Sequence, residues 1–128
     1  MRENLTRNQK TIAVFDDDPD LLDIFCFLLD EEGYHVVAFD NCDDITSKVR
    51  EVNPVLILMD NWIPLVGGEK AIGQLRNEED LKHIPVILIS ASNDVAEVSR
   101  RAGANGFIAK PFDFEVILNM VNKLLQNH

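Results

Sequence analysis

Five short apolar runs, rich in β-branched and aromatic side chains, constrain the fold of this chain more than any other feature. The runs are TIAVF (11–15), HVVAF (35–39), VLILM (55–59), PVILI (85–89) and GFIA (106–109). Several are continuously apolar and do not alternate with polar residues, which is typical of strands that are covered on both faces. The runs therefore predict the strands of a parallel sheet.

Helical patterns follow each of these runs. Their apolar stripes are Leu21, Phe25, Leu28 and Leu29; Ile45, Val49 and Val52; Ala71, Ile72 and Leu75; Val95, Val98 and Ala102; and Ile117, Met120, Val121 and Leu124. Asp18 suits an N-cap with Pro19 at the first helical position, and Gly33 suits the end of that helix. The alternation predicts an α/β fold, a doubly wound five-stranded parallel sheet with right-handed crossovers and helices on both faces.

The size and charge of the chain restrict its partners. A length of 128 residues suits one domain, which we place at residues 11–128 after a polar leader at 1–10. A formal net charge of -10 argues against direct binding to nucleic acid, which needs a basic surface. The sequence has neither an apolar run near the roughly 20 residues of a membrane span nor the apolar region of a signal peptide. We expect a cytoplasmic protein with no membrane partner.

Polar side chains follow several of the predicted strands, at the edge where parallel sheets bind ligands. The first run is followed by Asp16, Asp17 and Asp18, the third by Asp60, the fourth by Ser90 and the fifth by Lys110. Like charges about 4 Å apart repel by roughly 4 kcal/mol at an effective dielectric constant near 20. A hard cation offsets this repulsion, and Mg²⁺ prefers a few carboxylates with waters and often a phosphate. Asp18 is assigned to the helix cap, and the other carboxylates predict a Mg²⁺ site with room for a phosphoryl group.

Four segments of the sequence together resemble the receiver domains of two-component response regulators. They are VFDDDP, LILMDNWIPLVGG, IPVILISA and AGANGFIAKPF, and the resemblance covers residues 10–126. It implies a flavodoxin-like fold of the chemotaxis-regulator type with strand order 2-1-3-4-5. It also implies an aspartate that takes a phosphoryl group from a phosphohistidine on a sensor histidine kinase or a histidine phosphotransfer protein.

The resemblance assigns roles to the acidic residues. It implies that Asp60 is the phosphoacceptor, that Asp17 binds Mg²⁺ directly and that Asp16 acts mainly through water. Asp60 and the backbone carbonyl of Trp62 are the other implied metal ligands. The large Trp62 side chain departs from the small or polar residues usual near this position in the family. Because an indole cannot accept a proton from water and can cover the acyl phosphate, we expect slow self-dephosphorylation.

The resemblance also assigns three residues to phosphoryl recognition and switching. Ser90 stands where the family has a hydroxyl that bonds a phosphoryl oxygen, and Lys110 stands where a lysine pairs with the phosphoryl group. Phe107 occupies the aromatic switch position, so phosphorylation is expected to alter a surface of the fourth helix, fifth strand and fifth helix. We expect no turnover of a separate substrate, and the downstream target or linked output domain is not indicated by the sequence.

Two other functions fit parts of the sequence. Asp16 and Asp18 form a D-x-D pattern that resembles the first motif of haloacid-dehalogenase phosphatases, in which Asp16 would be the nucleophile and Asp18 the general acid. The short chain and the lack of an acidic pair at a strand end after Lys110 weigh against this Mg²⁺-dependent phosphatase. A receiver-like binding module that is never phosphorylated is the other alternative, and the presence of every expected side chain weighs against it.

Overall fold

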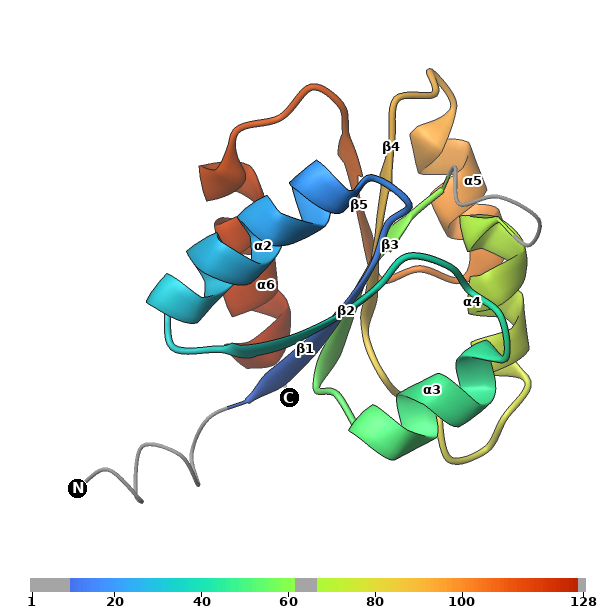
Figure 1. Cartoon of the computed structure of the whole chain (residues 1–128). Helices are drawn as coiled ribbons and strands as arrows, with labels where there is room; N and C mark the ends of the chain where they lie inside the picture. The colour runs from blue at the N-terminus through green and yellow to red at the C-terminus, as the bar shows by residue number, and fades with distance from the viewer. Residues whose placement is uncertain (1–9, 62–66, 127–128) are drawn as a thin grey trace.

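A five-stranded parallel sheet lies at the centre of the computed structural model, which describes residues 10–61 and 67–126 (Figure 1). The elements in chain order are β1 (Thr11–Phe15), α2 (Pro19–Glu31), β2 (His35–Phe39), α3 (Ile45–Val52), β3 (Leu56–Asp60), α4 (Gly68–Arg76), β4 (Val86–Ser90), α5 (Val95–Ala102), β5 (Gly106–Ala109) and α6 (Phe114–Gln126). The strand order is β2-β1-β3-β4-β5, and every pair of neighbouring strands is parallel. The predicted fold class and strand order are confirmed.

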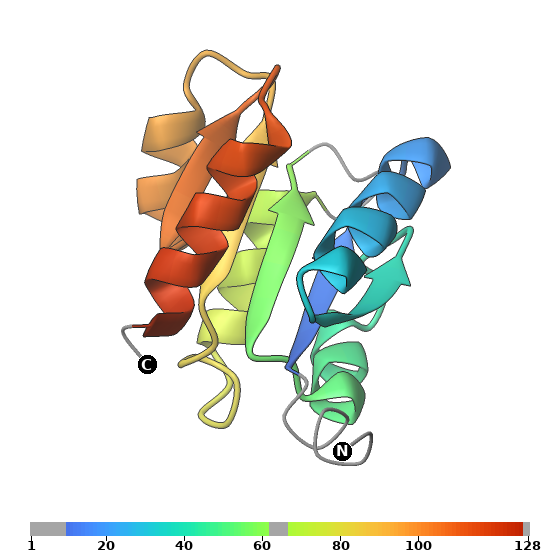
Figure 2. The same cartoon turned by 90° about the vertical axis from the view of Figure 1, so that its left-hand side faces the viewer.

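Helices cover both faces of the sheet. Helices α2 and α6 lie on one face and α3, α4 and α5 on the other, and the turned view places α6 and α2 in front of the sheet (Figures 1 and 2). Successive side chains of β1 enter opposite cores: Ile12 and Val14 pack toward α2 and α6, whereas Ala13 and Phe15 pack toward α3 and α4. Because each face is buried, both sets of positions are apolar, which explains the continuous apolar runs.

Strands β3 and β4 each end one residue later than the apolar runs predicted. Asp60 pairs with Ile89 in the ladder, and Ser90 pairs with Ala109. The backbone pairing of a strand continues through a polar residue when its neighbouring strands also continue. Asp60 and Ser90 are therefore held by the sheet itself and not by a loop.

Helix α2 begins at the cap that the sequence predicted. The Asp18 carboxylate accepts hydrogen bonds from the backbone N–H groups of Asp20, at 3.0 Å, and Leu21, at 3.4 Å. Pro19 is the first helical residue, and Gly33 follows the helix at φ +94°, a backbone conformation that favours glycine. Across residues 10–61 and 67–126, no helix combines the length and apolar character needed to cross a membrane.

Candidate metal and phosphoacceptor site

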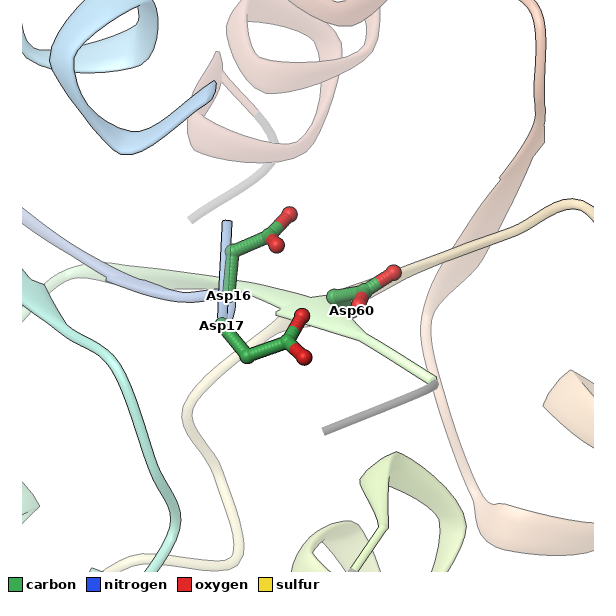
Figure 3. Close-up of side chains that lie close together, drawn as sticks. All are labelled: Asp16, Asp17 and Asp60. Carbon is green, nitrogen blue, oxygen red and sulfur yellow. The ribbon is translucent and has the colours of Figure 1, made fainter. Parts of the chain in front are cut away.

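Three carboxylates meet at the carboxyl ends of β1 and β3, which are neighbours in the sheet. Asp16 and Asp17 directly follow β1, and Asp60 is the last residue of β3. One oxygen from each side chain lies within 4.8 Å of the other two, and Figure 3 shows the three carboxylates grouped together. Hard carboxylate oxygens in this arrangement are a suitable donor set for Mg²⁺. The structure thus brings together the three side chains that the sequence predicted as metal ligands.

Asp16 is one of the two buried carboxylates of the cluster. Its side chain is buried, its Oδ1 accepts a hydrogen bond from the Asp18 N–H at 3.0 Å, and within the described residues its buried Oδ2 has no hydrogen-bond partner. Burial raises the pKa of Asp16 to about 6 against the lowering effect of the Asp18 N–H, and the nearby Asp60 charge raises it further. A buried oxygen without a partner costs free energy of folding. A cation or a water bound to Oδ2 would remove this cost. Asp16 therefore fits a metal site.

Lys110 supplies a positive charge next to Asp60. Its Nζ lies 3.1 Å from Asp60 Oδ1. The lysine directly follows β5, and its backbone N–H donates to the Ser90 carbonyl at 2.9 Å, which ties the end of β5 to that of β4. An ammonium group at this position can neutralise an anion that is attached to or bound beside Asp60.

Ser90 and Phe107 lie on the two strands beyond β3. Ser90 is fully buried at the end of β4, and its Oγ accepts a hydrogen bond from the Ser92 N–H at 3.0 Å. Phe107 lies on the edge strand β5 and has 42% of its surface exposed. Trp62, the remaining predicted site residue, lies outside the described residues.

Gly68 is a residue of the site that the sequence reasoning missed. Its N–H donates to the Asn61 carbonyl at 3.3 Å. A Cβ atom at this position would lie 2.9 Å from Asn61 Cα and 3.0 Å from the Asp60 carbonyl oxygen, closer than such atoms pack. Only glycine lets the start of α4 approach the backbone of Asp60 this closely. The Gly67-Gly68 pair after the loop was the available signal, since adjacent glycines often mark a close backbone approach.

The fold and the site together define a class of protein. A doubly wound sheet of order 2-1-3-4-5, with an acidic cluster and a lysine at the carboxyl ends of its strands, is the arrangement of a phosphoacceptor signalling module. The chain belongs to the response regulator receiver domain family, whose model matches residues 12–122. This membership confirms the resemblance and places the chain in two-component signalling, where receiver domains pair with histidine kinases or phosphotransfer proteins.

Individual relatives agree with the family assignment. The chain is 34% identical over 119 residues to the CAI-1 autoinducer sensor kinase/phosphatase CqsS of Vibrio cholerae, and the match covers 91% of this chain but 17% of CqsS. It is 28% identical to protein PilH of Pseudomonas aeruginosa, with 89% of this chain and 96% of PilH covered. The response regulator TrrA of Thermotoga maritima, solved in complex with Mg²⁺-BeF, has a TM-score of 0.80, 27% identity and coverage of 91% of this chain and 99% of TrrA. The chain thus spans a small part of CqsS and nearly all of PilH and TrrA.

Proposed function

We propose that Asp60 accepts a phosphoryl group from a phosphohistidine. The contact between Asp60 Oδ1 and Lys110 Nζ at 3.1 Å, beside the acidic cluster, is the observation that carries this proposal. An Asp60 carboxylate oxygen attacks the phosphorus in line, the phosphorus–nitrogen bond breaks, and the histidine leaves with the bonding electron pair and takes up a proton. The product is an acyl phosphate on Asp60. Because the bonds to phosphorus are weak in the transition state, the protein contributes mainly position and charge.

Each neighbouring group has a role in this proposal. Asp16, Asp17 and Asp60 would hold Mg²⁺. The backbone carbonyl of Trp62, which lies outside the described residues, stays a predicted fourth ligand. When bound, Mg²⁺ supplies positive charge to the phosphoryl oxygens. Lys110 turns from the free carboxylate to a phosphoryl oxygen.

Two further residues carry the signal in this proposal. The Ser90 hydroxyl donates a hydrogen bond to another phosphoryl oxygen. The Phe107 ring then turns inward, toward the space that the Ser90 hydroxyl has left. The strand order supports these roles, because β4, which ends at Ser90, lies between β3, which ends at Asp60, and β5, which carries Phe107 and precedes Lys110.

The Mg²⁺ assignment has support from two sources. The donor set consists of carboxylates, and one of them, Asp16, has a buried oxygen that finds no hydrogen-bond partner among the described residues. The similar structure of TrrA was solved in complex with Mg²⁺ and a beryllium fluoride. We infer that this chain binds the same cation, at its own acidic cluster.

The proposal extends to partners and location. The inferred phosphodonor is a sensor histidine kinase or a histidine phosphotransfer protein. Direct binding to nucleic acid is not expected, because the net charge of the chain is -10. We infer no turnover of a separate substrate beyond self-dephosphorylation. We also infer a cytoplasmic location.

Mass mapping after phosphorylation by a small donor tests the proposal. Incubation with Mg²⁺ and phosphoramidate should add one phosphoryl group, and Asp60→Asn should abolish this product. Asp40→Asn is the matched control, since Asp40 is an exposed aspartate after the edge strand β2. Phosphate mapped to Asp16 would contradict the proposal and favour the phosphatase, and no product at all would favour the binding module.

A further inference from the structure

Two aspartates precede helices near the site, and their carboxylates have different partners. Asp18 has an extended backbone with ψ 108°, and its carboxylate caps the first turn of α2. Asp94 occupies the same position before α5 but has ψ 25° and makes no side-chain bond to the first turn of that helix. Its carboxylate instead accepts a hydrogen bond from the Ser92 hydroxyl. The start of α5 is thus left without the cap that its own sequence could provide.

The Ser92–Asp94 contact is linked to the buried serine of the site. The Ser92 N–H donates to Ser90 Oγ at 3.0 Å, while Asp60 contacts Lys110. In the described part of the chain, Ser90 Oγ makes no hydrogen bond to Asp60 or Lys110. Ser90, Ser92 and Asp94 are therefore linked by hydrogen bonds from the site to Asp94, the residue that precedes α5.

We propose that Ser92 and Asp94 act as a latch that favours the unphosphorylated form, a role that rests on the proposed function of Asp60. When the Ser90 hydroxyl turns to a phosphoryl oxygen, the Ser92 N–H loses its acceptor. The segment of residues 91–94 then rearranges, and the Asp94 carboxylate exchanges the Ser92 hydroxyl for the free N–H groups at the start of α5. Aspartate is among the best N-cap residues, so this second arrangement is also favourable.

The exchange of partners gives the latch a mechanical consequence. An N-cap residue normally has an extended backbone, as Asp18 has. To cap α5, Asp94 has to change ψ from 25° toward the Asp18 value, and this rotation moves the start of the helix. The turn of one buried hydroxyl is thereby converted into a displacement of α5. Two alternative bonding patterns of similar free energy are what a two-state element requires.

Beryllofluoride affinity in the presence of Mg²⁺ tests the latch. Ser92→Ala removes the hydroxyl that holds Asp94 and leaves the net charge unchanged, so it should release the latch and tighten beryllofluoride binding about fivefold, the effect of one ordinary hydrogen bond. Asn93→Ala is the matched control, because Asn93 is exposed in the same segment and has no side-chain hydrogen bond within the described residues. Its affinity should equal that of the wild type.

The possible outcomes separate the latch from the proposed function. If the wild type binds beryllofluoride and folded Ser92→Ala binds it no more tightly than the wild type does, the result would overturn the latch and leave the proposed function intact. A wild-type protein that does not bind beryllofluoride with Mg²⁺ would overturn the proposed function and the latch with it. A structure of the wild-type complex gives a second test that needs no variant. The Asp94 carboxylate should then accept from the N–H groups of Ala96 or Glu97, and an unchanged bond to Ser92 would refute the exchange.

Discussion

Lys110 Nζ contacts Oδ1 of Asp60 across the end of β4, at a distance of 3.1 Å. The Asp60 side chain is almost fully buried, whereas that of Lys110 keeps 29% of its surface exposed. The ammonium group therefore neutralises a carboxylate that would otherwise be repelled by Asp16 and Asp17. The same group repels a metal ion and attracts a phosphoryl group, so its removal should affect the two ligands in opposite directions.

We predict that Lys110→Met tightens Mg²⁺ binding and weakens beryllofluoride binding. The affinity for Mg²⁺ should rise a few-fold because a competing positive charge is removed. The affinity for beryllofluoride should fall about tenfold or more, since a hydrogen bond to a charged group contributes about 1.5–3 kcal/mol. Titration calorimetry measures both, with the exposed Lys123→Met as control. An unchanged beryllofluoride affinity in Lys110→Met would show that Lys110 does not contact the phosphoryl group.

The raised pKa of Asp16 predicts an unusual pH dependence of stability in the metal-free protein. Its pKa is about 6 in the folded chain against 3.8 ordinarily, so between these values the folded state holds a proton that the unfolded state releases. The free energy of unfolding should therefore rise, by up to about 3 kcal/mol from this group, as the pH falls from 7 toward 4. Denaturant titrations of the wild type and Asp16→Asn in a chelator measure this contribution.

The Asp16→Asn variant should be more stable than the wild type at pH 7. It should also lack the rise in the free energy of unfolding that Asp16 gives the wild type as the pH falls. Added Mg²⁺ should suppress the effect in the wild type, because the cation favours the ionised carboxylate. Protons compete with the metal, so Mg²⁺ should bind more weakly at pH 5 than at pH 7. Parallel pH profiles for the wild type and the variant would show that Asp16 is not the group responsible.

Asp17 and Asp18 should separate metal binding from helix capping. Asp17 contributes an oxygen to the acidic cluster, whereas the Asp18 carboxylate bonds the first turn of α2. We expect Asp17→Asn to weaken Mg²⁺ binding more than Asp18→Asn does. Asp18→Ala should lower the free energy of unfolding by about 1 kcal/mol through loss of the cap. Equal Mg²⁺ affinities of the two asparagine variants, by calorimetry, would contradict this division.

Gly68 and Gly73 lie in the same helix and should respond in opposite ways to alanine. At Gly68 a Cβ would lie 2.9 Å from Asn61 Cα, whereas at Gly73 it would meet no atom of the described residues within 4 Å. Gly68→Ala should destabilise the fold by about 1–3 kcal/mol and slow phosphorylation, because it displaces the backbone of Asp60, the proposed acceptor. Gly73→Ala should stabilise the helix by about 0.5–1 kcal/mol and leave phosphorylation unchanged. Thermal unfolding and phosphoramidate kinetics give the two readouts, and equal effects at both positions would argue against the close approach at Gly68.

Phe107 should become less exposed when the site is occupied. In the unphosphorylated chain 42% of its surface is accessible on β5. If the ring turns inward on activation, its exposure should fall in crystals grown with Mg²⁺ and beryllofluoride. A phenylalanine has no hydroxyl to hold either rotamer, so we expect partial occupancy of both positions. Identical ring positions in free and bound crystals would argue against a switch at this residue.

The sequence by itself determined the class of fold and the membership of the acidic cluster. The continuous apolar runs indicated strands that are buried on both faces. The amphipathic helical segments between the runs indicated that these strands are parallel. Because the carboxyl ends of parallel strands meet at one edge, Asp16, Asp17 and Asp60 could be placed together without coordinates. Asp18 could be assigned to a cap because capping depends on residues that are neighbours in the chain.

Only the tertiary structure decided the contacts that make the cluster a site. The 3.1 Å contact of Lys110 with Asp60 joins side chains that are 50 positions apart in the chain, and it depends on strand register. The buried Oδ2 of Asp16, which has no partner within residues 10–61 and 67–126, and the raised pKa of this side chain depend on how completely neighbouring elements exclude water. The need for glycine at position 68 depends on how closely α4 approaches β3. Local patterns report the conformation and burial of a segment, whereas these properties arise when separate segments pack against each other.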